Sequence, residues 1–197
     1  MTSVDLYEAL MTTRAVRHFD DAPVTDDEIE RCLAAACQAS VAGGVQPYEF
    51  VVVTDAALRD RLARLHAEAC DADADSDVAE AMGRAPVLVL VLTPSRTTDH
   101  TDGTPPDAGP ADASVYPAVQ NLVLAARSQG LGTALTTDIR RRSAEVRELL
   151  GIPDGHDIAA LVPLGRPAER WGLAERRPWW TLTSRDRFGT RPSPGGG

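Results

Sequence analysis

The sequence contains no lysine and only three cysteines. All 20 basic residues among its 197 are arginines, and they stand against 29 acidic residues, so the formal net charge is −9. An acidic chain lacks the broad basic face that general nucleic-acid binding needs, although a local arginine cluster can still hold one anion. Three cysteines are too few, and odd in number, for a disulfide framework, which favours a reducing compartment.

Long hydrophobic runs are also absent. No apolar stretch approaches the roughly 20 residues of a membrane-spanning helix, and the opening segment MTSVDLYEAL lacks the basic region of a secretory signal. We therefore expect a cytoplasmic protein without a membrane partner or a nucleic-acid partner. The length suits one domain with a buried core.

Helical and strand patterns alternate along the chain. Thr25 to Glu28 is a capping box, and Asp55 is a candidate cap for a later helix. Continuous apolar character over 86–92 predicts a strand covered on both faces. We expect helices over 4–11, 25–40, 113–129 and 143–150 and after Asp55, and strands over 49–54, 86–92, 133–137 and 158–164. This alternation indicates an α/β or α+β fold with a central sheet.

Three segments define the organisation of the chain. The helix predicted over 113–129 is apolar nearly all round, which is typical of a core or a subunit interface. Residues 95–112 are rich in proline, glycine and aspartate and predict a polar loop inserted in one domain, 1–189. The Pro/Gly-rich end, 190–197, predicts a disordered tail.

Two arginine pairs lie near opposite ends of the sequence. Arg14 and Arg17 point to one side if their turn is helical, and such a pair suits a bound phosphate. A solvated pair, or ion pairs with the nearby aspartates at 20–21, is the simpler interpretation of these residues alone. Arg176 and Arg177 form the second pair, and the two pairs together could hold one phosphate.

Motifs that would place catalysis on side chains are missing. The sequence has no Gly-x-Ser-x-Gly elbow, no P-loop and no His-Glu-x-x-His. His66 and Cys70 are spaced for a metal, but no second Cys/His group completes the ligand set, so we predict no metal site. The lack of an acid–base constellation fits a protein whose cofactor carries the reaction.

Six short motifs in fixed order resemble the nitroreductase family of flavoproteins. The resemblance runs from about residue 4 to residue 189, and the order of the motifs makes it specific although no single one is decisive. The motifs are TRAVRHFD with the following PV (13–24), QPYEFVVV (46–53), AVQNLVLAAR with GLG (118–132), LGIP (150–153), LGRP (164–167) and RRP (176–178).

The resemblance implies an α+β fold, a three-layer sandwich with a central mixed sheet and a C-terminal extension exchanged in a homodimer. Members hold FMN at the dimer interface. They pass a hydride from NADH or NADPH to the flavin N5 and then to a small conjugated acceptor such as a nitroaromatic or a quinone. No side chain of the protein is implied as catalytic, since the flavin carries the chemistry.

Ten cofactor-binding positions follow from the same resemblance. Arg14, Arg17 and Arg176 match the ligands of the FMN phosphate and ribityl chain. Thr136 and Thr137 match the segment facing the flavin N5/O4 edge. The full set is Arg14, Ala15, Arg17, Gly44, Gln46, Gly132, Thr136, Thr137, Arg176 and Arg177, with Gln46 in a loop that reaches the flavin of the other subunit.

The chain departs from the common family pattern at the flavin-contacting motifs. Ala15 stands where the family commonly has serine, and Val41 and Gly44 stand at a serine and an asparagine position. Two alternatives therefore remain beside the oxidoreductase. One is a non-catalytic dimer that binds or sequesters flavin, or has lost it, and the other is a flavin-fragmenting enzyme similar to dimethylbenzimidazole synthase.

Overall fold

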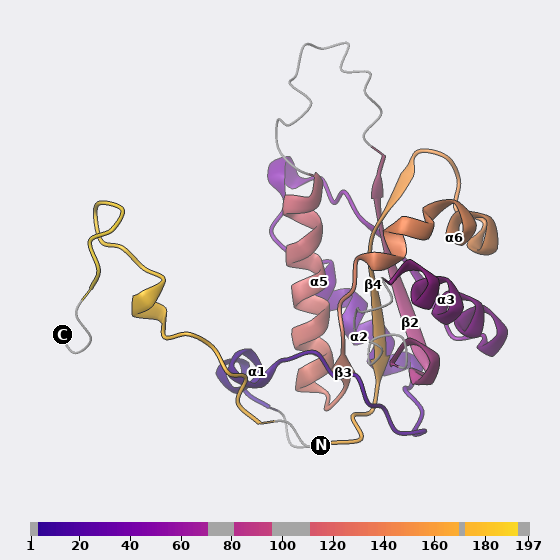
Figure 1. Cartoon of the computed structure of the whole chain (residues 1–197), viewed down its shortest axis with the longest axis horizontal. Helices are drawn as coiled ribbons and strands as arrows, with labels where there is room; N and C mark the ends of the chain where they lie inside the picture. Colours follow the sequence, from indigo (N-terminus) through magenta and orange to yellow (C-terminus); the bar gives the residue numbers. More distant parts are fainter. Residues whose placement is uncertain (1–3, 71–80, 96–110, 170–171, 193–197) are drawn as a thin grey trace, which may run out of the picture.

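The computed structural model describes residues 4–70, 81–95, 111–169 and 172–192 (Figure 1). The helices are α1 (Leu6–Thr12), α2 (Asp26–Ala36), α3 (Ala56–Ala69), α5 (Ala111–Ser128) and α6 (Ser143–Leu150), with 3₁₀ turns η1 (Ala42–Gly44), η2 (Asp138–Arg142) and η3 (Trp179–Thr181). The strands are β1 (Glu49–Val53), β2 (Val87–Pro94), β3 (Gly132–Thr133) and β4 (His156–Gly165). Most of the predicted loop 95–112 and tail 190–197 lies outside the described residues, and the domain limits stay a prediction.

The four strands form one sheet in the order β1-β2-β4-β3. All three ladders are antiparallel, with Val51 opposite Leu90 and Leu90 opposite Leu161. The expectation of a mixed sheet was therefore wrong for these strands. Among the described residues, parallel pairing occurs at the Ala15–Thr133 bridge, outside the named strands.

Helices cover both faces of the sheet, so the fold is the expected three-layer α+β sandwich (Figure 1). Alternate residues of β2 enter two separate cores: Val87, Val89 and Val91 pack with α2 and α5, while Leu88, Leu90 and Leu92 pack with α3 and α6. Every residue of β2 from Val87 to Thr93 is buried. The continuous apolar run thus reflects a strand covered on both sides, as predicted.

Capping groups place several helix ends where the sequence predicts them. Thr25 and Glu28 form the reciprocal capping box at the start of α2, and the Asp55 carboxylate accepts from the Leu58 N–H at the start of α3. Gly130 follows α5 with φ 79°, a left-handed conformation that glycine adopts without strain. The predicted strand over 133–137 was too long, because pairing in β3 stops at Thr133.

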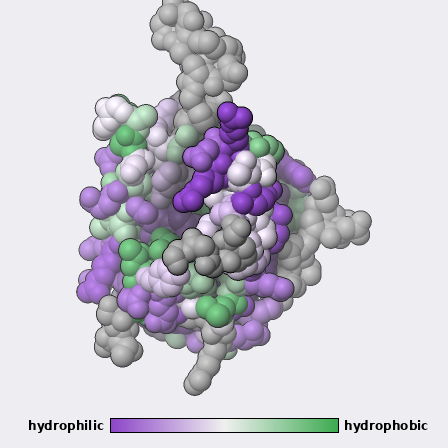
Figure 2. Space-filling model, turned by 90° about the vertical axis from the view of Figure 1, so that its left-hand side faces the viewer, coloured by the Kyte–Doolittle hydropathy of each residue, from purple (hydrophilic) through white to green (hydrophobic). Residues whose placement is uncertain are grey.

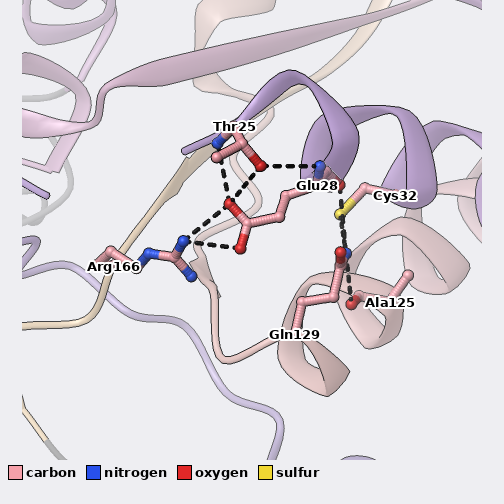
Figure 3. A network of polar contacts seen from close by, with 6 residues as sticks. All are labelled: Thr25, Glu28, Cys32, Ala125, Gln129 and Arg166. Carbon is pink, nitrogen blue, oxygen red and sulfur yellow. Dashed lines mark hydrogen bonds and ion pairs between the residues drawn. The ribbon is translucent and has the colours of Figure 1, made fainter. Parts of the chain in front are cut away.

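An ion pair between the buried Glu28 and the half-buried Arg166 joins the start of α2 to the residue that follows β4 (Figure 3). Arg166 Nη2 lies 2.7 and 2.8 Å from the two carboxylate oxygens of Glu28, which also accept from the backbone N–H and hydroxyl of Thr25. Gln129, just beyond α5, donates to the Glu28 carbonyl and lies 3.3 Å from the Cys32 Sγ. Burial raises the pKa of the Cys32 thiol to about 12, so this thiol stays protonated.

Removing the cation of this pair leaves a buried carboxylate without its partner. We expect Arg166→Met to lower the free energy of unfolding by about 1–3 kcal/mol, because the buried Glu28 carboxylate loses its charge-assisted hydrogen bonds and its counter-charge. Urea unfolding at neutral pH measures the change. Arg61→Met, on the exposed surface of α3, is the control, and an equal loss in both variants would contradict the structural role of Arg166.

The same pair makes stability depend on pH. Burial by itself raises the pKa of Glu28, but hydrogen bonds from Thr25 and Arg166 and the charge of Arg166 outweigh it and hold this pKa below its ordinary value of 4.5. The folded state then binds fewer protons than the unfolded state, so this contribution is present above pH 4.5 and is lost as the pH falls through the folded pKa.

We therefore expect the stability difference between the wild type and Glu28→Gln to shrink as the pH is lowered from 7 to about 3.5. Urea unfolding across that range measures it. Glu30→Gln, on the exposed side of α2, is the matched control. A difference for Glu28→Gln that stays constant with pH would show that the carboxylate charge contributes nothing.

No described helix is both long enough and apolar enough to span a bilayer.

Candidate functional site

The segment after α1 docks against β3. The Val16 N–H donates to the Thr133 carbonyl at 2.8 Å, and Ala15 forms a bridge with Thr133. Gly132 lies directly against Val16, because a Cβ atom built on Gly132 would be 2.7 Å from the nearest atom of the Val16 side chain. The absence of a side chain at Gly132 therefore allows the 14–17 segment to lie on the sheet edge.

Arg14 then contacts the C-terminal extension of the same chain, whose described part is residues 172–192. Its Nη2 donates to the Leu173 carbonyl at 3.3 Å, and the Ala174 N–H donates to the Met11 carbonyl at 3.5 Å. A Cβ on Gly172 would approach the Arg14 guanidinium to 3.1 Å. Residues about 160 positions apart thus come together next to α1.

An open cavity of about 770 Å³ lies between these segments. It brings together Arg14 from the N-terminal pair with Arg176 and Arg177 from the C-terminal pair. The lining also includes Tyr7, Leu10, Met11, Thr13, Ala15, Gln120, Val123, Thr133, Leu135, Leu173, Ala174, Pro178 and Trp179. Its volume is within the range of small-molecule and cofactor sites.

The charge of this cavity is unbalanced. Within the described part of the chain, no carboxylate lies at ion-pair distance from Arg14, Arg176 or Arg177. Three guanidinium groups on one concave surface repel one another unless an anion binds between them. The forked N–H donors of a guanidinium match the spacing of phosphate oxygens. Because the remaining wall is largely apolar, the cavity fits a phosphorylated ligand with a hydrophobic body.

The predicted cofactor positions divide into two groups. Arg14, Ala15, Arg176 and Arg177 line the cavity. The other six do not, and of these Gly132 lies beneath Val16 next to the lining residue Thr133. The residues outside the lining are Arg17, Gly44, Gln46, Gly132, Thr136 and Thr137.

Gln46 and Gly44 belong to the loop between α2 and β1. Gly43 and Gly44 have φ of 61° and 74°, a left-handed backbone that favours glycine. The Gln46 amide donates to the Cys37 carbonyl at 2.9 Å and lies 3.3 Å from the Tyr48 hydroxyl. These bonds hold the loop against its own chain, and neither Gly44 nor Gln46 lines the arginine cavity.

Thr136 is buried and lies outside the cavity lining. Its hydroxyl lies 2.9 Å from His66 Nε2 and 3.4 Å from the Asp138 carboxylate, and its backbone pairs with Leu161. Thr137 directly precedes η2. In the segment 133–137, Thr133 and Leu135 therefore line the cavity. Thr136 anchors the segment through its contacts with His66 and Asp138.

Sequence reasoning missed part of the cavity wall. The helix predicted over 4–11 rests on the apolar spacing of Tyr7, Leu10 and Met11. These side chains are 72%, 50% and 46% exposed and line the cavity. In α1 only Ala9 is buried. The signal was present, since an apolar helical stripe predicts a contact surface, but the sequence does not say whether that surface meets the core of its own chain.

Further apolar side chains are exposed along the C-terminal extension: Leu173, Trp179, Leu182 and Phe188. In Figure 1 this extension runs away from the body of the protein past α1. Figure 2 views the molecule from that side and shows hydrophobic patches among hydrophilic surface. An exposed apolar surface of this kind marks an interaction site.

The layered α+β fold carries a cavity whose arginines and apolar wall suit a phosphorylated, partly hydrophobic ligand. A model of the Nitroreductase family matches residues 10–166. The chain therefore belongs to the nitroreductase family.

Individual relatives agree with this assignment. The chain is 27% identical over 189 residues to the NADPH-flavin oxidoreductase of Vibrio harveyi, covering 92% of this chain and 73% of the relative. It is 31% identical over 187 residues to the 5,6-dimethylbenzimidazole synthase of Rhodospirillum rubrum, covering 84% and 87%. The solved NADPH:FMN oxidoreductase of Vibrio harveyi in complex with NAD⁺ has the same fold, with a TM-score of 0.73, 23% identity, and coverage of 93% of this chain and 77% of that one.

The contact between Gly132 and Val16 can be tested by a double-mutant cycle. We expect Gly132→Ala to destabilise the protein by about 1–3 kcal/mol through overpacking, and Val16→Ala to restore part of that loss in the double variant. Thermal unfolding measures each. Gly83→Ala is the control, because nothing lies within 4 Å of a Cβ there, and strictly additive effects of the Gly132 and Val16 changes would disprove the contact.

Proposed function

We propose that the chain is an FMN-dependent oxidoreductase that takes a hydride from NADH or NADPH and passes it to a small conjugated acceptor such as a nitroaromatic or a quinone. Membership of the nitroreductase family supports this, as does the similarity to a relative named NADPH-flavin oxidoreductase. The observation that carries the proposal is the cavity that Arg14 shares with Arg176 and Arg177.

These residues fit FMN. Arg14, Arg176 and Arg177 hold the phosphate, whose charge offsets their mutual repulsion. Leu10, Met11 and Leu135 supply apolar surface for the flat ring system in the same cavity. When bound, FMN supplies hydride acceptance and donation at its N5 atom, so the chain needs no acid–base pair of its own.

The role of the protein is then to bind FMN, to orient it and to exclude water from it. The bridge between Ala15 and Thr133 and the bond from Val16 set the position of Arg14 relative to the cavity wall. Arg14 in turn holds the extension through the Leu173 carbonyl. Four other predicted cofactor positions contribute to the site through the segments that dock together. These are Arg17 in the segment 14–17, and Gly132, Thr136 and Thr137 in the segment that follows α5.

A homodimer completes the site in this proposal. The cavity is open, and apolar residues of α1 and the extension are exposed beside it. A second copy of the chain buries that surface, and its loop carrying Gly44 and Gln46 closes the site from the other side. The C-terminal extension is the element exchanged between the subunits.

The decisive measurement is the absorption spectrum of the purified protein during FMN titration. We expect flavin absorption that bleaches on addition of NADH or NADPH. Each of Arg14→Ala and Arg176→Ala should weaken FMN binding about 10–100-fold, the equivalent of one lost charge-assisted hydrogen bond.

The control for this titration is Arg187→Ala, an exposed arginine in the extension outside the cavity. It should bind FMN as the wild type does. Wild-type protein that takes up no FMN, or equal affinity in all four proteins, would refute the assignment.

A second function is supported by the 31% identity to a dimethylbenzimidazole synthase. Such an enzyme consumes the flavin rather than recycling it. Incubation with reduced FMN and oxygen, followed by analysis of the products, separates the two, because an oxidoreductase returns intact FMN. A flavin-binding protein without activity would bind FMN and show no turnover with any acceptor.

A further inference from the structure

Three metal-ligating side chains converge on the side of the sheet away from the arginine cavity. His66 lies in the last turn of α3, Cys70 caps that helix, and Asp138 opens η2. One ligand atom from each lies within 4.8 Å of the others. From the sequence we predicted no metal site at His66 and Cys70, because no second Cys/His group completes the ligand set. The packing of α3 against η2 supplies a carboxylate, Asp138, as the third ligand.

His66 is prepared to act as a ligand. It is fully buried in the last turn of α3. Its Nε2 lies 2.9 Å from the Thr136 hydroxyl. The Cys70 Sγ lies 3.7 Å from Nδ1 and 3.9 Å from Nε2. When Nε2 carries the proton and donates it to Thr136, the Nδ1 lone pair is the one left for an ion.

Thr136 connects two of the ligands. Its hydroxyl lies 3.4 Å from Asp138 Oδ2 and accepts from the Asp138 N–H at 3.3 Å. A hydroxyl placed in this way fixes the ring orientation of the histidine and the rotamer of the carboxylate, as outer groups do around known metal ligands. Arg141 adds rigidity by donating to the Ala69 carbonyl at the end of α3.

We propose that His66, Cys70 and Asp138 form a binding site for a divalent cation of the zinc class. One nitrogen, one thiolate and one carboxylate match the ligand preferences of Zn²⁺ and Co²⁺, and a water molecule fills the fourth tetrahedral position. Cys70 and Asp138 are only partly buried, so they can close on the ion, and the thiol proton passes to solvent on binding.

Such an ion joins two elements that matter for the cavity. It links the end of α3 to the segment 133–138, whose residues Thr133 and Leu135 line the arginine cavity. Binding of the ion thus stabilises the position of the segment 133–138, and with it this wall of the cavity. The site does not depend on the proposed flavin function, since none of its three ligands lies in the cavity lining.

Cobalt binding to the full-length protein as purified provides the first test. We expect one Co²⁺ per chain with the visible bands of tetrahedral thiolate coordination, read at wavelengths beyond flavin absorption, and displacement by Zn²⁺. Cys70→Ser should abolish these bands. Cys37→Ser is the matched control, because Cys37 is an exposed cysteine outside the cluster.

Two further variants separate a metal site from a purely structural network. Asp138→Asn should weaken Zn²⁺ binding at least tenfold, and Thr136→Val, which keeps all three ligands, should weaken it about 10–100-fold. Zn²⁺ should raise the melting temperature of the wild type and of Cys37→Ser, but not that of Cys70→Ser.

Absence of metal binding at micromolar concentrations would overturn the proposal. So would Co²⁺ or Zn²⁺ binding that persists unchanged in Cys70→Ser, because the ion would then sit elsewhere. Failure of either kind is distinguishable from failure of the flavin function, since FMN content and bleaching by NADH or NADPH are measured separately on the same samples.

Discussion

The site depends on the docking of a short extended segment onto the edge of the sheet. The bond from the Val16 N–H to the Thr133 carbonyl, with the Ala15–Thr133 bridge, fixes where Arg14 leaves the backbone. Steric size controls this contact, because only a residue without a Cβ at 132 leaves room for Val16. From that anchor Arg14 reaches the extension at Leu173, and the cavity forms between the two.

Electrostatics then determines what the cavity accepts. The protein as a whole is acidic, with a formal net charge of −9, yet three arginines without carboxylate partners among the described residues face one concave surface. Elsewhere the fold pairs a buried charge, as Arg166 does with Glu28 inside a shell of hydrogen bonds. The contrast explains why the first group suits a ligand and the second a structural role.

Local sequence patterns predicted the helix caps correctly. They failed for features that depend on pairing between residues far apart in the sequence. Thr25, Asp55 and Gly130 act within a few residues, so their capping roles were readable. The length of β3 and the antiparallel direction of the ladders depend on partner strands distant in the sequence, and both were predicted wrongly. The apolar stripe of α1 was recognised, but its exposure reflects surface that its own chain does not cover.

The sequence by itself indicated helices and strands around a central sheet, the capped starts of α2 and α3, and the resemblance to the family. Hydrophobic periodicity, caps and ordered motifs depend on neighbouring residues, whereas the end of the helix predicted over 25–40 came too late, because α2 stops at Ala36. Only the tertiary structure decided that Arg14 shares a cavity with Arg176 and Arg177 while Thr136 turns toward His66 and Asp138. These groupings join residues 70 to 160 positions apart. Their distances follow from how the sheet edge, α3 and the extension pack together, which no local pattern encodes.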